Sequence, residues 1–396
     1  MKSSFLLRQN TVLATYILVA LVASVHLLIL KTDYFIPGYT HTSYNNFIIF
    51  KCSFSHLLHG QNLYVQYLDE QWDLFKYSPT FAFLMAPFAY LPSTIGLCLW
   101  NIFNALALFF AIRLLPLNNR SLMLLLWFIL AELLTSMQSQ QSNALITGLI
   151  IAAFCMLERG KYGIAALWIV FATFIKIYGG IAFCLFFFYP NKMKFIGYSL
   201  LWFIVFLLMP LIVISPRSLF DQYVNWETML TGVDATNYGW SLMGILQSWF
   251  GLGALKGYVM VAALIVFPIP LLRTGMHKNT RFRLLFLAAM LVWVIIFNHR
   301  AESPTYIIAV TGIAIWYFTQ PKATWRTVLL WFAFIVTCFS HSDIVPGNVR
   351  NHFVYPYYIK AFPSVILWVV IYVELLFMKP GNETNVENEN ILPGIS

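Results

Sequence analysis

Long apolar runs separated by short polar segments dominate the chain. A helix needs about 20 apolar residues to cross a bilayer. The pattern predicts ten such helices, at residues 11–30, 94–112, 121–137, 143–157, 195–213, 257–272, 284–298, 304–319, 326–340 and 361–378. We therefore expect an all-α polytopic membrane protein that crosses the bilayer about ten to twelve times.

Segment 163–189 is also apolar, but Lys176 and the pair Gly179-Gly180 interrupt it. Each half has about 13 residues and would be about 20 Å long as a helix, which is short for a full crossing. We predict a broken hairpin with both ends on the same side of the membrane and Lys176 at its tip.

The composition agrees with this class of protein. Of the 396 residues, 60% are hydrophobic and 10% are charged, whereas a soluble domain carries about 25% charged residues. The net charge is +9, but an excess of Lys and Arg in a membrane protein is typical of cytoplasmic loops. We therefore expect membrane lipids, and no nucleic acid, as partners.

The distribution of charge predicts the orientation. With the N-terminus in the cytoplasm and 163–189 as a hairpin, most of the 24 Lys and Arg residues fall in short cytoplasmic loops, and most acids fall outside. The prediction is one transmembrane domain over 1–379 in the cell membrane, with both termini cytoplasmic and outer loops at 31–93 and 214–256. The polar tail 380–396 is expected to be disordered.

Both outer loops contain short apolar stretches. Residues 76–92 (KYSPTFAFLMAPFAYLP) carry three prolines and are too short to span, so we expect a re-entrant or interfacial segment. Residues 241–252 (SLMGILQSWFGL) are typical of an interfacial amphipathic helix.

Common nucleotide and hydrolase motifs are absent from the sequence. It has no P-loop, GxGxxG, GxSxG or HExxH motif. It also has no Cys or Cys/His spacing typical of zinc. We therefore expect neither a cofactor nor a metal ion.

Four segments carry a family resemblance. They are NNFIIFKCSFSHLLHGQNLY (45–64), KYSPTFAFLMAPFAYLP (76–92), QSNALITGLIIAAF (141–154) and ATFIKIYGG (172–180). Their order resembles that of the polyprenol-phosphate-sugar-dependent glycosyltransferases of the GT-C class, in particular the α-mannosyltransferase group of glycosyltransferase family 87. The resemblance implies a GT-C-like helical bundle with a large first outer loop. It also implies transfer of a sugar such as mannose from a polyprenyl-phosphate donor to an envelope lipid or glycan acceptor on the outer face.

One position departs from the family pattern. The pattern places an Asp, the expected general base, before an aromatic residue near the start of the first outer loop, where this chain has Asn46 before Phe47. An amide cannot accept a proton at neutral pH. The remaining candidates for the base are Asp73, Glu302 and Asp33, with Asp73 or Glu302 preferred. Each could instead be an ordinary solvated or interfacial acid.

Basic residues near the outer boundary are candidates for binding the donor phosphate. The candidates are Lys76, Arg300 and Lys176, and Arg300 offers a planar fork that suits phosphate. His299, in the same short turn, and Asn46 complete the predicted binding set. Alternatively, Arg300 pairs with Glu302, and Lys176 pairs with Glu132. Residues 138–143 (QSQQSN) could bind sugar hydroxyls, but a plain hydrophilic loop is the preferred interpretation.

Two other classes of function remain open. A lipid or glycan transporter or flippase would place ionisable groups near the bilayer midplane, often between internal repeats. The chain shows no repeat, and only Glu132, Glu374 and Lys176 lie within apolar segments. A non-catalytic relative that binds the lipid carrier is the third hypothesis, and Asn46 favours it.

Overall fold

The computed structural model describes residues 5–30, 35–36, 39–40, 42–232 and 238–379. Its α-helices are α1 (Gln9–Ile29), α2 (Asn45–Leu58), α3 (Pro79–Leu84), α4 (Ala86–Ala89), α5 (Ser93–Arg113), α6 (Asn119–Phe128), α7 (Leu130–Gln138), α8 (Asn143–Glu158), α9 (Tyr162–Ile175), α10 (Lys192–Leu208), α11 (Pro216–Gly232), α12 (Leu242–Phe250), α13 (Lys256–Val266), α14 (Thr280–Ile296), α15 (Tyr306–Thr319), α16 (Thr324–Ala333), α17 (Gly347–Val349) and α18 (Phe362–Phe377).

Shorter elements connect these helices. The 3-10 helices are η1 (Phe5–Leu7), η2 (Ile177–Phe188), η3 (Met209–Ile212), η4 (Gly253–Leu255), η5 (Ile269–Leu272), η6 (Thr274–Met276), η7 (Ser303–Thr305) and η10 (Ile359–Ala361). Two π-helices are η8 (Phe334–Phe339) and η9 (Arg350–Val354). Strands β1 (Phe35–Ile36) and β2 (Tyr39–Thr40) pair antiparallel, with Phe35 opposite Thr40.

The structure confirms an all-α membrane protein, because every one of the ten predicted apolar segments is helical. In the described ranges, five helical stretches are long and apolar enough to span a bilayer by themselves: Gln9–Ile29, Ser93–Arg113, Lys192–Ile212, Gly253–Leu272 and Ile359–Phe377. A sixth arises if α6 and α7, which meet at a bend of 44°, form one broken span. The other helices are shorter, so the figure of ten to twelve crossings stays a prediction.

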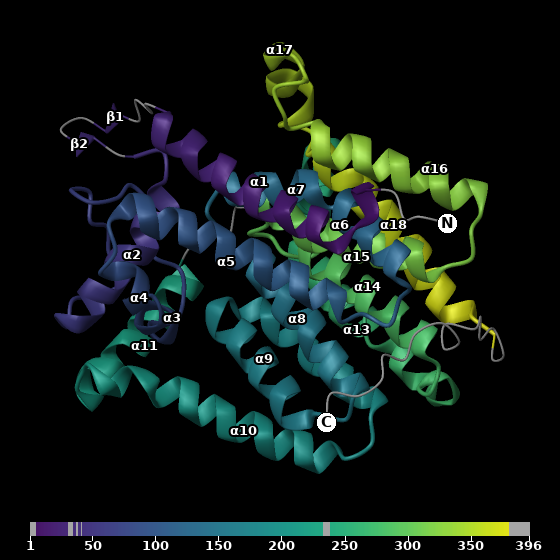
Figure 1. The fold of residues 1–396 in the computed structure, drawn as a ribbon, viewed down its shortest axis with the longest axis horizontal. Helices are drawn as coiled ribbons and strands as arrows, with labels where there is room; N and C mark the ends of the chain where they lie inside the picture. Colours follow the sequence, from purple (N-terminus) through teal and green to yellow (C-terminus); the bar gives the residue numbers. More distant parts are fainter. Residues whose placement is uncertain (1–4, 31–34, 37–38, 41, 233–237, 380–396) are drawn as a thin grey trace.

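Helices α8, α14 and α15 form the interior of the bundle. They lie between α10 at one margin and α16 at the other (Figure 1), and nearly all residues of α14 and α15 are buried. Gly312 of α15 lets α14 approach closely, since a Cβ there would lie 2.7 Å from the Ala288 carbonyl oxygen. Close helix contacts at small residues are typical of membrane bundles, where van der Waals packing replaces the hydrophobic effect.

Helices α10 and α13 lie at the margin and turn apolar side chains outward. Leu200, Leu201 and Phe203 on α10, and Leu264 and Ile265 on α13, are all exposed. Such faces would be unstable in water but are compatible with lipid acyl chains. These two helices therefore define part of the lipid-facing surface.

Segment 163–189 forms the predicted hairpin. α9 ends at Ile175, Lys176 is extended with φ −140° and ψ 129°, and η2 then packs back against α9. Gly179 allows this return, because a Cβ on it would lie 2.6 Å from the Ala172 carbonyl. The far end, Tyr189, donates a hydrogen bond to Glu158, beside the start of α9. Both ends of the hairpin therefore lie together, and Lys176 lies at the tip.

Hydrogen bonds gather the predicted cytoplasmic loops at one end of the bundle, here named the arginine end. There Arg113 donates to Gln9 and Asn119, Arg159 to Leu114, Arg281 to Gln320, Arg283 to Glu158, Arg326 to Glu374, and Arg273 to Leu375 and Met378. The predicted outer loops meet at the opposite end, here named the site end. The loops are thus sorted as the charge pattern predicted, while the orientation of the two ends in a membrane stays a prediction.

The first large loop contributes short helices to the site end. Segment 76–92 contains only the six-residue α3 and the four-residue α4, so it does not form one spanning helix. Ser78 caps α3 by accepting a hydrogen bond from the Phe81 amide, and its hydroxyl donates to the Phe174 carbonyl of α9. This bond holds the segment against the hairpin, next to Lys176.

Candidate active site

A hydrogen-bonded network at the site end joins three segments that are distant in sequence. Gln141 Nε2 donates to Glu302 Oε2 at 2.5 Å, and Asn143 Nδ2 donates to Gln141 Oε1 at 2.8 Å. Lys176 Nζ donates to Asn143 Oδ1 at 3.0 Å and to Gln141 Oε1 at 3.4 Å. Two neutral amides therefore bridge the carboxylate of Glu302 and the ammonium of Lys176.

The local fold explains how these groups meet. Asn143 begins α8 and is fully buried, where its amide also donates to the Pro304 carbonyl at 3.1 Å. Glu302 directly precedes η7 and is exposed, whereas Gln141 is buried. The network thus has a buried amide base and a solvent-exposed carboxylate at its rim.

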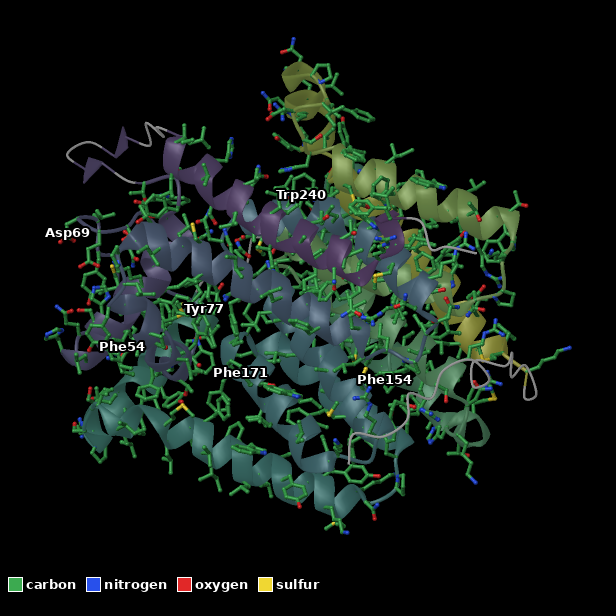
Figure 2. The ribbon with its side chains drawn as sticks, viewed as in Figure 1. Phe54, Asp69, Tyr77, Phe154, Phe171 and Trp240 are labelled. Atoms are coloured by element: carbon green, nitrogen blue, oxygen red, sulfur yellow. The ribbon has the colours of Figure 1, made fainter. Side chains whose placement is uncertain are left out.

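Two tyrosine rings flank Lys176. Its Nζ lies 5.4 Å from the ring centroid of Tyr77 and 5.8 Å from that of Tyr178, within the range of cation–π attraction. The Tyr178 hydroxyl also donates to Asn143 Oδ1 at 3.0 Å. Tyr77, labelled in Figure 2, precedes the cap of α3. The first loop therefore supplies one wall around the ammonium group.

Asp73 and Lys76 form an ion pair with each other near this wall. Lys76 Nζ lies 2.9 Å from Asp73 Oδ2, and both side chains are more than a third exposed. Burial raises the pKa of the Tyr77 phenol, and the carboxylates of Glu302 and Asp73 raise it further. Both predicted acids therefore act on the same ring, but the amide bridge engages only Glu302.

Arg300 and His299 are oriented by the second large loop. Arg300 Nη2 donates to the Leu230 carbonyl at the end of α11, at 2.9 Å. Burial lowers the pKa of His299, and the positive charges of Lys256 and Arg300 lower it further. These two residues form a basic region beside Glu302, and the Arg300 guanidinium is hydrogen-bonded to α11.

Asn46, at the start of α2, has a clear structural role. Its Nδ2 donates to the Ser139 carbonyl at 2.9 Å, in the turn that carries Gln141. A carboxylate at this position could not donate that bond. Asp33, the third candidate base, lies outside the described residues.

Two sequence interpretations need correction. Glu132 pairs with Lys360, at 2.8 Å, and not with Lys176. The polar segment 138–143 is no plain hydrophilic loop, because Gln140, Gln141, Ser142 and Asn143 are all buried.

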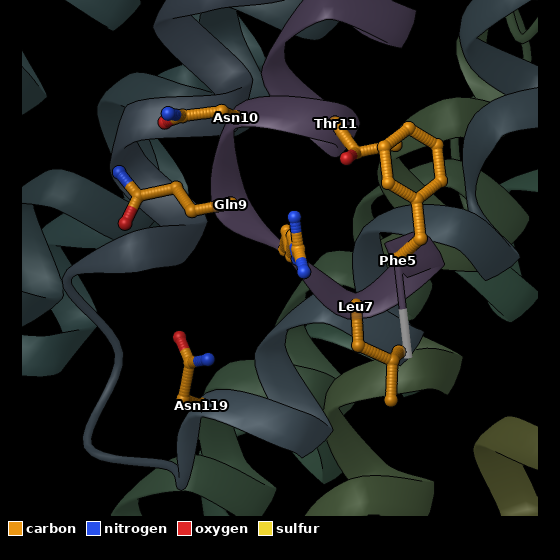
Figure 3. Close-up of a pocket in the computed structure, with 7 residues that line it drawn as sticks. Phe5, Leu7, Gln9, Asn10, Thr11 and Asn119 are labelled. Atoms are coloured by element: carbon orange, nitrogen blue, oxygen red, sulfur yellow. The ribbon is translucent and has the colours of Figure 1, made fainter. Parts of the chain in front are cut away.

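A separate hollow of about 510 Å³ lies at the arginine end. Figure 3 shows its lining at the start of α1, where Gln9 lies across the opening from Asn119. The side chains around it come from the N-terminal segment and from α6, and none belongs to the network of Glu302 and Lys176. We therefore assign the hollow no part in the site.

Sequence reasoning missed the neutral members of the network. Gln141, Asn143, Tyr77 and Tyr178 were not among the predicted site residues. The available signals were the run of six amide and hydroxyl residues at 138–143, next to an apolar stretch, and Tyr178 two residues after a lysine in an apolar segment. Polar residues at such positions must find partners, and these residues bind one another.

Comparison with known proteins identifies the family. No curated protein matches the chain significantly. The model of glycosyltransferase family 87 matches residues 75–297, which is more than half of the chain and runs from just before α3 to the end of α14. The match includes Lys76, Gln141, Asn143 and Lys176. The chain therefore belongs to glycosyltransferase family 87 and is a multi-pass membrane glycosyltransferase that acts on a sugar donor and an acceptor.

Proposed function

We propose that this enzyme transfers a sugar, such as mannose, from a polyprenyl-phosphate carrier to an envelope lipid or glycan acceptor on the outer face of the cell membrane. The observation that supports it best is the bridge Glu302–Gln141–Asn143–Lys176. It holds one carboxylate and one ammonium a short distance apart through groups that carry no charge. Transfer from a lipid phosphate needs both: a proton acceptor for the incoming hydroxyl and a cation for the leaving phosphate.

In the proposed reaction, the acceptor hydroxyl attacks the anomeric carbon in line with the phosphate ester bond. Glu302 accepts the hydroxyl proton as the new C–O bond forms. The bond between the anomeric carbon and the phosphate oxygen breaks, and the electron pair leaves with polyprenyl phosphate. Lys176 stabilises the negative charge of that phosphate, with Lys76 and Arg300 at the rim.

Glu302 is preferred over Asp73 as the base. Asp73 already forms an ion pair with Lys76, so its carboxylate is occupied by another side chain. The Glu302 carboxylate accepts a hydrogen bond from the neutral amide of Gln141, so its negative charge remains available to the acceptor hydroxyl. We assign the Asp73–Lys76 pair to the rim, where Lys76 assists in binding the phosphate.

The proposed orientation places the arginine end in the cytoplasm, as the positive-inside rule favours. Single cysteines at Asp73 and Lys278, in a background without reactive native cysteines, test it with a membrane-impermeant thiol reagent. We expect labelling of position 73 from the external side and none of position 278. Labelling of position 278 alone would show that the orientation is the reverse and that the site end faces the cytoplasm.

A transfer assay in lipid nanodiscs tests the chemistry. The donor is polyprenyl-phosphate mannose with labelled sugar, and the acceptors are supplied as an envelope lipid extract. Glu302→Gln should lower the release of sugar from the donor by about 100-fold or more, while binding of polyprenyl phosphate is kept. Lys176→Met should weaken that binding by about tenfold.

Matched controls are available on other surfaces. Asp221→Asn removes an exposed carboxylate of α11 whose partner is Arg217, and Lys192→Met removes an exposed lysine at the start of α10. Both should behave as wild type. Loss of turnover in Asp73→Asn with full activity in Glu302→Gln would show that Asp73, and not Glu302, is the base. Failure of the wild-type protein to bind polyprenyl phosphate would overturn the proposed donor.

A non-catalytic carrier-binding function is the second candidate, and Asn46 is the observation that favours it. On this hypothesis the wild-type protein binds polyprenyl phosphate but releases no sugar, and Asn46→Asp restores turnover. On the proposed function, Asn46→Asp lowers turnover, because it removes the donor to Ser139 that holds the Gln141 turn.

A further inference from the structure

A fully buried ion pair lies close to the site but outside its network. Lys360 Nζ donates to Glu132 Oε1 at 2.8 Å, and the two side chains are 1% and 0% exposed. Glu132 belongs to α7, and Lys360 belongs to η10, directly before α18. The Thr337 hydroxyl donates to the Lys360 carbonyl, which ties the pair to η8 as well.

The pair is connected to both halves of the site. Glu132 lies on α7, which ends at Gln138, and precedes Gln141 by nine residues in the sequence. Lys360 Nζ lies 5.4 Å from the ring centroid of Tyr306, which begins α15 four residues after Glu302. Two sets of contacts therefore join the α7 side of the site to the Glu302 turn. One is the Gln141–Glu302 hydrogen bond, and the other runs from Glu132 through Lys360 to Tyr306.

Tyr306 also connects these contacts to the second large loop. Its hydroxyl donates to the Trp240 carbonyl at 2.8 Å, and the Trp240 amide donates to the Ala301 carbonyl at 2.8 Å. Trp240 is labelled in Figure 2. Ala301, directly before Glu302, is thus bonded to Trp240, which Tyr306 binds in turn. The ring of Tyr306 also lies over the buried ammonium group of Lys360.

Stability alone does not explain such a pair. Burial of two charges removes both from water, and apolar side chains of similar volume often stabilise a fold as well or better. A charged pair does fix distance and direction more strictly than an apolar contact, since its energy depends on one pair of atoms. Its location between the two turns points to a role in aligning them.

We propose that Glu132 and Lys360 are positioning residues, which fix the 138–143 turn against the 302–305 turn and so set Glu302 relative to Lys176. This inference rests on the proposed function for its consequence in catalysis. Neither side chain reaches solvent, so neither takes part in the transfer itself. A displacement of about 1 Å at a reacting group can cost about 100-fold in rate.

The test compares four variants in nanodiscs: Glu132→Gln, Lys360→Met, the neutral double variant E132Q/K360M, and the exchanged pair E132K/K360E. The neutral double variant has no unpaired buried charge, so it should fold with a melting temperature near that of the wild type. Its turnover should nevertheless fall by about tenfold or more, with the KM for the donor little changed. The exchanged pair should recover most of that turnover.

Wild-type turnover in the neutral double variant would overturn the inference, since the pair would then be merely structural. A second readout needs no activity. Spin labels at Gln138 and His299, with Cys52, Cys98 and Cys184 replaced, report the distance between the two turns. One narrow distance distribution in the wild type and a broad one in the neutral double variant support the inference, even if the wild type proves inactive. Identical distributions would contradict it.

Discussion

The two ends of the bundle hold their charges in different ways. At the arginine end, Arg283 contacts both oxygens of Glu158, at 2.5 and 2.7 Å. Glu374 there accepts from Arg326 at 2.7 Å through one oxygen and from Trp316 at 2.8 Å through the other. At the site end, Glu302 and Lys176 bind neutral amides. Removing one partner of a largely buried ion pair leaves an uncompensated charge, whereas charges held by neutral groups remain available to a ligand.

Burial sharpens this contrast. The side chains of Glu158 and Arg283 are only 15% and 11% exposed. Removal of either residue would therefore leave the charge of the other largely buried and without its ion-pair partner. Glu302 is exposed, and water can solvate it without Gln141. We therefore expect substitutions at the arginine end to affect stability, and substitutions at the site end to affect turnover.

The largest effect on stability is expected for Glu158→Ala. The substitution leaves the Arg283 guanidinium nearly buried and unpaired, which costs about 3–5 kcal/mol. The measurement is thermal unfolding in nanodiscs. Glu302→Ala is the matched change at the site end and should cost less than about 1 kcal/mol. Equal losses of stability in the two variants would contradict the comparison.

The second effect concerns the amide bridge. Gln141→Ala removes the hydrogen bond from Gln141 to the Glu302 carboxylate and one acceptor of Lys176. Turnover should fall by about tenfold, because both groups lose their orientation. Unfolding stability should change much less than in Glu158→Ala. Unchanged turnover, measured in the same nanodiscs, would exclude the bridge from catalysis.

The general fold could be predicted from sequence because it follows from local properties. The length of each apolar run sets which segments can span, and the interruption at Lys176 and Gly179 marks the hairpin tip. The bend between α6 and α7 was missed, since residues 128–130 carry neither glycine nor proline. Tertiary packing determines that bend, and no local residue signals it.

The site was only partly predictable. Charged residues near the ends of apolar segments are visible in a sequence, and so Glu302 and Lys176 were among the predicted site residues that the structure brings into one network. Their bridge was not predicted, since Gln141 and Glu302 are 161 residues apart. The pairing of Glu132 with Lys360 spans 228 residues and failed for the same reason. Side-chain partners across a bundle depend on helix register, which one sequence does not reveal.

The smallest effect is a pH dependence at the site end. Burial lowers the pKa of His341 from 6.5 to about 4, with Lys360 and Arg350 contributing. Between these values the unfolded chain binds more protons than the folded one, so stability falls as the pH falls below 6.5. At pH 5.5 this costs about 1 kcal/mol relative to pH 8.

His341→Gln removes that contribution. Its unfolding free energy should decline less between pH 8 and pH 5.5 than that of the wild type, by about 1 kcal/mol. Thermal unfolding of both proteins at the two pH values measures the difference. Parallel declines would show that His341 titrates normally in the folded protein.

The most direct test of the central claim is a structure of the protein with polyprenyl phosphate in nanodiscs, determined by cryo-electron microscopy. The site end is proposed to bind the donor phosphate because Glu302 and Lys176 are held there by neutral groups. We predict density for the phosphate within hydrogen-bond distance of Lys176 Nζ, on the side that faces Glu302. A phosphate bound among the arginines of the arginine end, with Lys176 still bonded to Asn143 and Gln141, would contradict the account.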